Sequence, residues 1–231
     1  MPLITVIDED RPLRRDAERN RRRILDAARE LFAQCGLEVS LNDIAHHAGV
    51  GVGTVYRRFP DREQLIDSLF QERMEEMVAI AERAAADPDP WRGLVGFFEQ
   101  SLELQAHDFG LKDLVASAPD GMARVGQIRA RLLPLGEQIV RRAQASGQLR
   151  ADVAPTDMAI LQLMVSAVID ASRDVAPDVW RRFLSIVLSG LAAAPAADEG
   201  LPARALAPTE VDAVMSRSAH ARRSVRRPPV S

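Results

Sequence analysis

Apolar residues recur at helical spacing along nearly the whole chain, and this pattern constrains the fold more than any other feature. The first stripe consists of Ile24, Leu25, Ala28, Leu31, Phe32 and Cys35, which share one side of a helix with 3.6 residues per turn. Similar patterns predict further helices over 40–49, 52–59, 61–87, 89–102, 111–117, 122–146, 155–172 and 177–191. Since no segment alternates as a strand would, the predicted fold class is all-α, with about nine helices.

Residues that start and stop helices flank several of these segments. Ser40 and Asp43 form the pattern of an N-cap with a carboxylate in the first turn. Gly49 suits a left-handed stop at the end of the same helix. Asp61 and Asp89 are expected to cap the helices that follow them.

The composition is that of a globular chain without a membrane segment. Of the 231 residues 47% are hydrophobic, yet no run of about 18 uncharged apolar residues could span a bilayer. The start, MPLITVIDEDR, lacks the basic and long apolar regions of a secretory signal. The single cysteine, Cys35, cannot form an internal disulfide, so we expect a cytoplasmic protein.

The net charge of −3 conceals a segregation of charge along the chain. Residues 11–62 carry +4, residues 63–203 carry −8, and the residues from 204 onward carry +4. A basic segment is typical of proteins that bind nucleic acid. Arginines cluster at what would be the start of the first helix, where the helix dipole disfavours cations, so DNA phosphate is the expected partner of Arg21 and Arg22.

Two short helices joined by residues 48–51 form the pattern of a helix-turn-helix, whose second helix can enter the major groove of DNA. Eight helical residues span roughly 12 Å, which matches the width of that groove. Val55 and Phe59 are expected to face the helices behind. The residues left on or near the outer surface, and expected at DNA, are Gly51, Val52, Thr54, Tyr56, Arg57 and Arg58.

The stretch SLNDIAHHAGVGVGTVYRRFPDREQL, preceded by RRRILDAARELFAQCG, resembles the DNA-binding signature of the TetR family of bacterial transcriptional regulators. The resemblance covers about residues 21–69. It implies a three-helix DNA-binding domain, a connecting fourth helix, and an all-helical C-terminal domain that dimerises and holds a small-molecule pocket. It also implies that Ser40 caps the second helix against phosphate, and that Arg62, in place of the family's usual lysine, binds phosphate.

Two neighbouring residues depart from the family pattern. Many members have Ser-Lys where this chain has Gly51-Val52, so a capping hydroxyl and a phosphate-binding cation are both missing. A glycine cap costs only a few tenths of a kcal/mol relative to serine, and Arg57 and Arg58 can restore the charge. Val52 is then free to touch a thymine methyl group, which is a further hypothesis.

The C-terminal segment contains two sets of apolar residues that are candidates for an effector pocket and for a dimer interface. Both sets are equally typical of an ordinary core. The residues expected to line an effector pocket are Phe97, Phe98, Leu102, Phe109, Met122, Met158 and Met164. The residues expected at a two-fold dimer interface are Val165, Ile169, Trp180, Phe183, Leu184 and Val187. A dimer is favoured because helix-turn-helix domains read half-sites ~34–36 Å apart.

The sequence therefore predicts a flexible arm over 1–15, a helix-turn-helix domain over 16–62, a helical ligand-binding and dimerisation domain over 63–194, and a disordered tail over 195–231. The expected function is that of a homodimeric repressor that a small molecule releases from operator DNA. The alternatives are a helical interaction protein without operator recognition and a helical enzyme. No catalytic constellation, cofactor motif or metal-ligand spacing can be read from the chain, so neither a cofactor nor a metal is expected.

Overall fold

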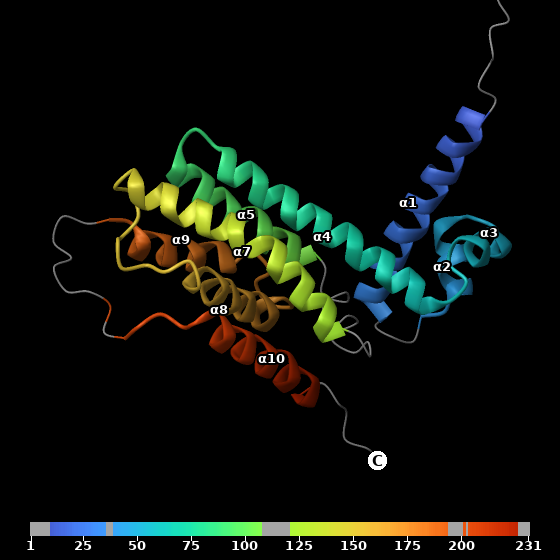
Figure 1. The fold of residues 1–231 in the computed structure, drawn as a ribbon. Helices are drawn as coiled ribbons and strands as arrows, with labels where there is room; N and C mark the ends of the chain where they lie inside the picture. Colours follow the sequence, from blue (N-terminus) through green and yellow to red (C-terminus); the bar gives the residue numbers. More distant parts are fainter. Residues whose placement is uncertain (1–9, 36–38, 108–120, 194–200, 202, 226–231) are drawn as a thin grey trace, which may run out of the picture. The chain divides into compact units, whose positions relative to one another are not determined.

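The computed structural model describes residues 10–35, 39–107, 121–193, 201 and 203–225 (Figure 1). Within these ranges the chain forms nine helices and no strand, which confirms the predicted all-α class. The structure divides into two compact units, unit 1 over Met1–Gln71 and unit 2 over Glu72–Ser231. The observed boundary therefore lies inside a helix, some residues after the predicted boundary at 62.

Unit 1 contains α1 (Asp10–Cys35), α2 (Leu41–Ala48), α3 (Val52–Arg58) and the first part of α4 (Arg62–Ala86). The middle helix, α2, packs against both α1 and α3. Residues with almost no exposed surface form the core: Ile24, Leu25, Ala28, Phe32, Ile44, Val55, Phe59, Leu65 and Leu69. The predicted stripe of α1 is confirmed in its buried members, but Leu31 is half-buried and Cys35, the last residue of the helix, is exposed.

The first helix begins earlier than the sequence analysis predicted. Because α1 starts at Asp10, the flexible arm predicted over 1–15 is wrong for residues 10–15. An aspartate at the first position and Pro12 within the first turn both suit a helix start.

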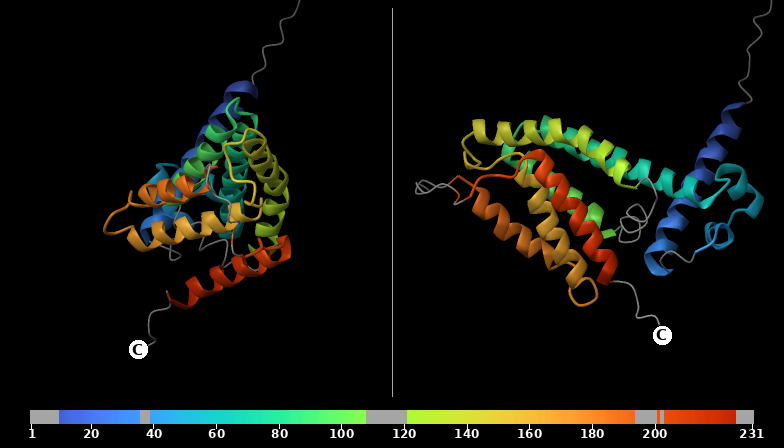
Figure 2. Two further views of the ribbon diagram at one scale, coloured as in Figure 1. Left: turned by 90° about the vertical axis from the view of Figure 1, so that its left-hand side faces the viewer. Right: turned by 60° about the horizontal axis from the view of Figure 1, so that its bottom comes forward.

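Unit 2 contains the rest of α4 together with α5 (Pro90–His107), α7 (Gly121–Ala145), α8 (Asp157–Ser172), α9 (Trp180–Leu191) and α10 (Pro208–Val225). The central helix is α5, which packs against α7, α8 and α9, while α10 packs against α8 (Figure 2). The apolar core includes Leu94, Phe98, Leu102, Ile139, Val140, Val165, Ile169, Trp180 and Leu184. The helix predicted over 111–117 lies outside the described residues.

The predicted helix caps of unit 1 and unit 2 are confirmed. At the start of α4 the backbone N–H of Gln64 donates to Oδ1 of Asp61 at 2.8 Å. At the start of α5 the N–H groups of Trp91 and Arg92 donate to Oδ1 of Asp89 at 3.0 and 3.1 Å. Each aspartate thus satisfies donors that the first turn of a helix leaves unpaired.

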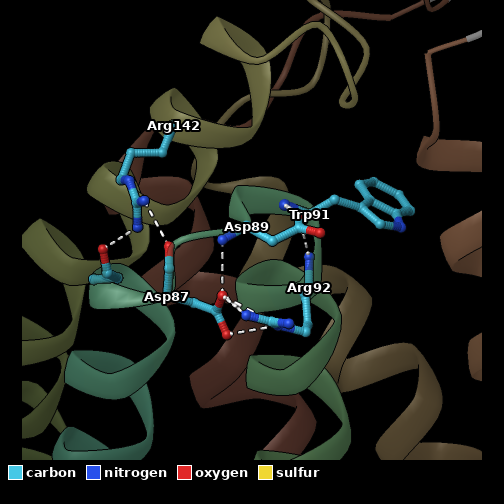
Figure 3. Close-up of polar contacts among 6 residues, drawn as sticks. Asp87, Asp89, Trp91, Arg92 and Arg142 are labelled. Carbon is cyan, nitrogen blue, oxygen red and sulfur yellow. Dashed lines mark hydrogen bonds and ion pairs between the residues drawn. The ribbon is translucent and has the colours of Figure 1, made fainter.

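The turn between α4 and α5 is tied to α7 (Figure 3). Arg92 binds the Asp87 carboxylate through both Nη2, at 2.7 Å from Oδ1, and Nε, at 3.1 Å from Oδ2. These hydrogen bonds from Arg92 lower the pKa of Asp87. From α7, Arg142 donates to the backbone oxygens of Ala85 and Asp87. The carbonyl groups that α4 leaves unpaired at its C-terminus therefore have a charged donor.

The disorder predicted for residues 195–231 is wrong for 208–225, which form α10. Val211 of this helix is fully buried. Ahead of it, Arg204 donates to both carboxylate oxygens of Glu210, at 2.7 and 2.6 Å, and the N–H of Ala207 donates to Glu210 at 2.8 Å. The N–H of Leu201 donates to Asp152 at 3.0 Å. One buried apolar residue, the local contacts of Glu210 and one long-range hydrogen bond hold a segment whose composition alone suggests disorder.

Acid is expected to loosen α10. Hydrogen bonds from Arg204 and the Ala207 N–H lower the pKa of Glu210 from 4.5 to about 2, and a hydrogen bond from Arg150 lowers the pKa of Asp152 from 3.8 to about 2. Both folded-state pKa values are depressed, so the stabilisation is complete above about pH 4.5 and is lost as the pH falls toward 2. Hydrogen-exchange protection of residues 208–217 should therefore drop over this range, and a Glu210→Gln variant should show the lower protection already at pH 7. Equal protection at pH 5 and pH 2.5 would contradict this assignment.

Candidate nucleic-acid interface

The second helix of unit 1 is held at its start by a reciprocal pair of hydrogen bonds. The N–H of Asp43 donates to Oγ of Ser40 at 3.2 Å, and the N–H of Ser40 donates to Oδ2 of Asp43 at 3.0 Å. The Ser40 hydroxyl donates to the same carboxylate oxygen at 2.6 Å. This is a capping box, and the hydrogen bonds from Ser40 lower the pKa of Asp43. The predicted N-cap is confirmed, while contact of Ser40 with phosphate stays a prediction.

The turn between α2 and α3 requires a glycine. Gly49 has φ 61° and ψ 39°, the left-handed conformation predicted for it. Its carbonyl oxygen accepts a hydrogen bond from Nη2 of Arg23 at 3.3 Å, and a Cβ placed on Gly49 would lie 3.0 Å from that nitrogen. Arg23 therefore supports the turn from α1. In the sequence Arg23 is only one of a run of arginines, because its partner Gly49 lies 26 residues away.

A second contact joins α2 to α1. Nε2 of His47 lies 2.6 Å from Oε2 of Glu30, and both side chains are largely exposed. This contact adds to the packing of α2 against α1, in which Ile44 and Ala45 are buried.

The third helix has a buried side and an exposed side. Val55 and Phe59 are buried, as predicted, and they anchor α3 to unit 1. Among the residues expected at DNA, Gly51, Tyr56, Arg57 and Arg58 are exposed, whereas Val52 and Thr54 are half-buried. No side chain caps α3, because its N-cap is Gly51, and a Cβ there would meet only Oγ1 of Thr54 at 3.7 Å.

Arg57 is oriented by its own helix. Its Nε donates to the carbonyl oxygen of Gly53 at 3.2 Å, and its Nη2 lies 3.4 Å from Oγ1 of Thr54. The remaining guanidinium N–H groups are available for phosphate or for the acceptor edge of guanine. A preoriented, exposed arginine in the last turn of α3 suits recognition of DNA.

The other arginines that were predicted to bind phosphate lie outside α3, in α1 and α4. Arg62 is half-buried, with its guanidinium carbon 5.6 Å from the ring centroid of Phe32, and its Nε is buried without an acceptor among the described residues. Arg21 and Arg22 lie in the middle of α1, and Nε of Arg22 is 3.6 Å from Glu18. The interpretation that these arginines stand at a helix start is therefore wrong, because α1 begins eleven residues before Arg21. Phosphate contacts of all three stay predictions.

Comparisons with known proteins agree with this geometry. Residues 24–69 match the family described as bacterial regulatory proteins, tetR family, and residues 89–193 match the SbtR-like C-terminal domain of transcriptional regulators. A solved TetR transcription regulatory protein from Mycobacterium vanbaalenii is 34% identical, with a TM-score of 0.59, and the match covers 78% of this chain and 99% of that chain. The chain belongs to the TetR family.

Two further relatives of this TetR-family chain differ in how much of the chain they match. A solved TetR regulator from Streptomyces coelicolor is 29% identical, with a TM-score of 0.60, over 75% of this chain and 98% of that chain. An HTH-type transcriptional regulator from Staphylococcus aureus (strain USA300) is 41% identical over 64 residues, which are 27% of this chain and 35% of the relative. The chain thus matches about a third of the length of that curated relative.

The residues predicted to line a pocket in the C-terminal domain of this TetR-family protein have several different environments. Phe97, Phe98, Leu102 and Met158 are buried in the core of unit 2. Met164 is 53% exposed, so its predicted place inside a pocket is wrong; it lies on the outer side of α8. Phe109 lies outside the described residues, as does the side chain of Met122.

Four of the six residues predicted at the dimer interface are buried within the protomer. Val165, Ile169, Trp180 and Leu184 are each buried to within 2% exposure in the core of unit 2, so their prediction as contacts between subunits is wrong. The reason is that α8 and α9 pack against each other and against α5, so these four side chains are covered within the protomer. Phe183 is exposed and Val187 is half-buried, so these two residues keep surface for a partner.

The described residues contain no group of three or more His, Cys, Asp or Glu side chains that could hold a metal ion. Within the same ranges, no helix is long and apolar enough to cross a membrane.

Proposed function

We propose that this TetR-family protein is a homodimeric transcriptional repressor of the bacterial cytoplasm, associated with the nucleoid when it is bound to operator DNA. In this proposal α3 enters the major groove, and a small molecule bound in unit 2 weakens the complex. The observation that carries the proposal is the outer face of α3, where Arg57 is held by Gly53 and Thr54 next to exposed Tyr56 and Arg58.

The distribution of charge supports DNA as the partner of unit 1. Residues 11–62 carry a net charge of +4, whereas residues 63–203 carry −8. The phosphate backbone attracts the first segment and repels the second. The acidic segment is therefore left for dimerisation and for sensing of an effector.

Exposed apolar side chains on α8 and α9 support a dimer. Met164, Phe183 and Ile186 are 53%, 43% and 57% exposed, which is unusual for large apolar residues on adjacent helices. A two-fold contact over these residues would pair two copies of α3, as half-sites one helical turn apart require.

Uncharged polar groups within unit 2 support an effector site. Oγ of Ser101, which is fully buried, donates to the carbonyl oxygen of Phe98 and accepts from Nε2 of Gln162. Gln105 then donates to Oε1 of Gln162 at 3.2 Å. Such groups between α5 and α8 can exchange partners with a neutral ligand. A coupling free energy of ~1–3 kcal/mol between ligand binding and DNA binding would weaken DNA binding by roughly 5–150-fold.

Replacement of Arg57 by alanine tests the DNA-binding proposal. Binding to the duplex upstream of the protein's own gene is expected to weaken by about 5–150-fold, because one arginine contact with a base is worth about 1–3 kcal/mol. Fluorescence anisotropy over a salt series measures both the affinity and its salt dependence. The matched control is Arg131→Ala, which removes another exposed arginine, from α7, and should leave both unchanged.

Two outcomes would contradict the proposal. Absence of any complex with this duplex at low salt would favour a helical interaction protein or an enzyme over a regulator. Equal losses for the Arg57 and Arg131 variants would mean that the protein attracts DNA by general charge and not through α3.

A further inference from the structure

Unit 2 has a half-open groove between α5 and α9, which we call the α5–α9 groove. Its volume is about 380 Å³, within the range of small-molecule sites. Its apolar floor is formed by Trp91 and Val95 of α5 and by Trp180, Leu184 and Leu188 of α9. None of the residues predicted to line an effector pocket takes part, so this site is separate from the one proposed above.

The two tryptophans of the chain both line this groove. Trp180 is almost fully buried, whereas Trp91 is half-buried, and its ring points away from the ion pair of Asp87 and Arg92 (Figure 3). Indole rings bind flat apolar groups by stacking and attract cations through the negative potential of their faces.

The charges around the groove leave a carboxylate without a partner. Arg181 lies with its guanidinium carbon 4.5 Å from the ring centroid of Trp180, and it forms ion pairs with Glu103 and with Asp178, the latter at 3.8 Å. Glu99, which also lines the groove, is exposed and forms no hydrogen bond or ion pair with any described residue. The groove therefore carries an uncompensated negative charge beside an apolar floor.

We propose that the α5–α9 groove binds a small organic cation that has an apolar body and one positive charge. The body lies over Val95 and the indole of Trp91, and the charge lies near Glu99. A neutral molecule of the same shape lacks the attraction to the carboxylate and to the indole face, and an anion is repelled by Glu99. The proposal concerns binding to unit 2 and does not depend on recognition of an operator.

Intrinsic fluorescence tests this proposal directly, because every tryptophan of the protein lies in the groove. The full chain is titrated with three probes that share one apolar body: (4-phenylbutyl)trimethylammonium, 4-phenylbutan-1-ol and 4-phenylbutyrate. We expect the cation to change the fluorescence and to bind about fivefold more tightly than the alcohol, as for one partly exposed ion pair, and the anion to bind more weakly than both. Equal affinities, an order led by the anion, or no saturable signal with the cation would overturn the proposal.

Two variants separate the groove from nonspecific binding. Glu99→Gln should lower the affinity for the cation toward that of the alcohol, leaving only the attraction to the indole face, and should leave the affinity for the alcohol unchanged. Glu82→Gln removes another exposed carboxylate, from α4, and should change neither affinity. Since Glu99 is exposed, its replacement leaves the fold intact, which circular dichroism verifies. Equal behaviour of the two variants would assign the cation to the acidic surface in general and would exclude the groove.

Discussion

A Gly93→Ala variant is expected to lose about 3 kcal/mol of stability toward urea, at the upper end of what overpacking costs. A Cβ on Gly93 would lie 2.4 Å from the carbonyl oxygen of Ala84 and 3.2 Å from Cβ of Asp87. Neither neighbour can move easily, because Ala84 is buried and Arg142 binds the adjacent carbonyl groups of Ala85 and Asp87 (Figure 3). The start of α5 and the end of α4 would have to separate, which opens the core of unit 2.

Gly96 of the same helix provides a matched control. A Cβ there would meet only the end of the Gln100 side chain at 3.4 Å, which can rotate away. Gly96→Ala should therefore be neutral or raise the free energy of unfolding by roughly 0.5–1 kcal/mol, since alanine is the better helix former. Urea midpoints of the two variants would distinguish a local close approach from a general cost of alanine in α5. Similar midpoints for both variants would contradict the assigned role of Gly93.

Features that depend on a few neighbouring residues were predictable from the sequence. The caps at Ser40, Asp61 and Asp89 each use a side-chain oxygen and an N–H two or three residues later. The left-handed turn at Gly49 and the burial of Val55 follow in the same way from local spacing. Such signals lie within one turn of helix, so no knowledge of the tertiary fold is required.

Features that depend on partners distant in the sequence were not predictable. The segment ahead of α10 is tied to unit 2 by the hydrogen bond of Leu201 with Asp152, which are 49 residues apart, and α10 itself packs against α8. The role of Arg23 at the turn and the packing of Arg62 on Phe32 likewise join different helices. Helical periodicity reports which residues share a face, but it does not report whether the same chain or a second copy covers that face. For this reason Trp180 and Leu184 were predicted at a dimer interface and are buried within the protomer.

The proposed function requires a dimer, in which a second copy of the chain covers the exposed apolar residues of α8 and α9. A Phe183→Glu, Ile186→Glu double variant is expected to be monomeric and to bind the duplex upstream of its own gene about 10²–10⁴-fold more weakly. Each replacement places a charge where the proposed interface excludes water, and a monomer loses the effective concentration that links its two half-sites. Both side chains are more than two-fifths exposed in the protomer, so the fold of unit 2 should persist.

Sedimentation equilibrium and anisotropy on the same samples test this expectation together. Val175→Glu is the matched control, because Val175 is 89% exposed and lies outside α8 and α9. It should leave both mass and affinity unchanged. A double variant that stays dimeric would place the interface elsewhere on the chain. A monomeric variant with undiminished affinity would show instead that one copy of α3 suffices for binding. The exposed apolar residues of α8 and α9 would then make no contribution to operator binding.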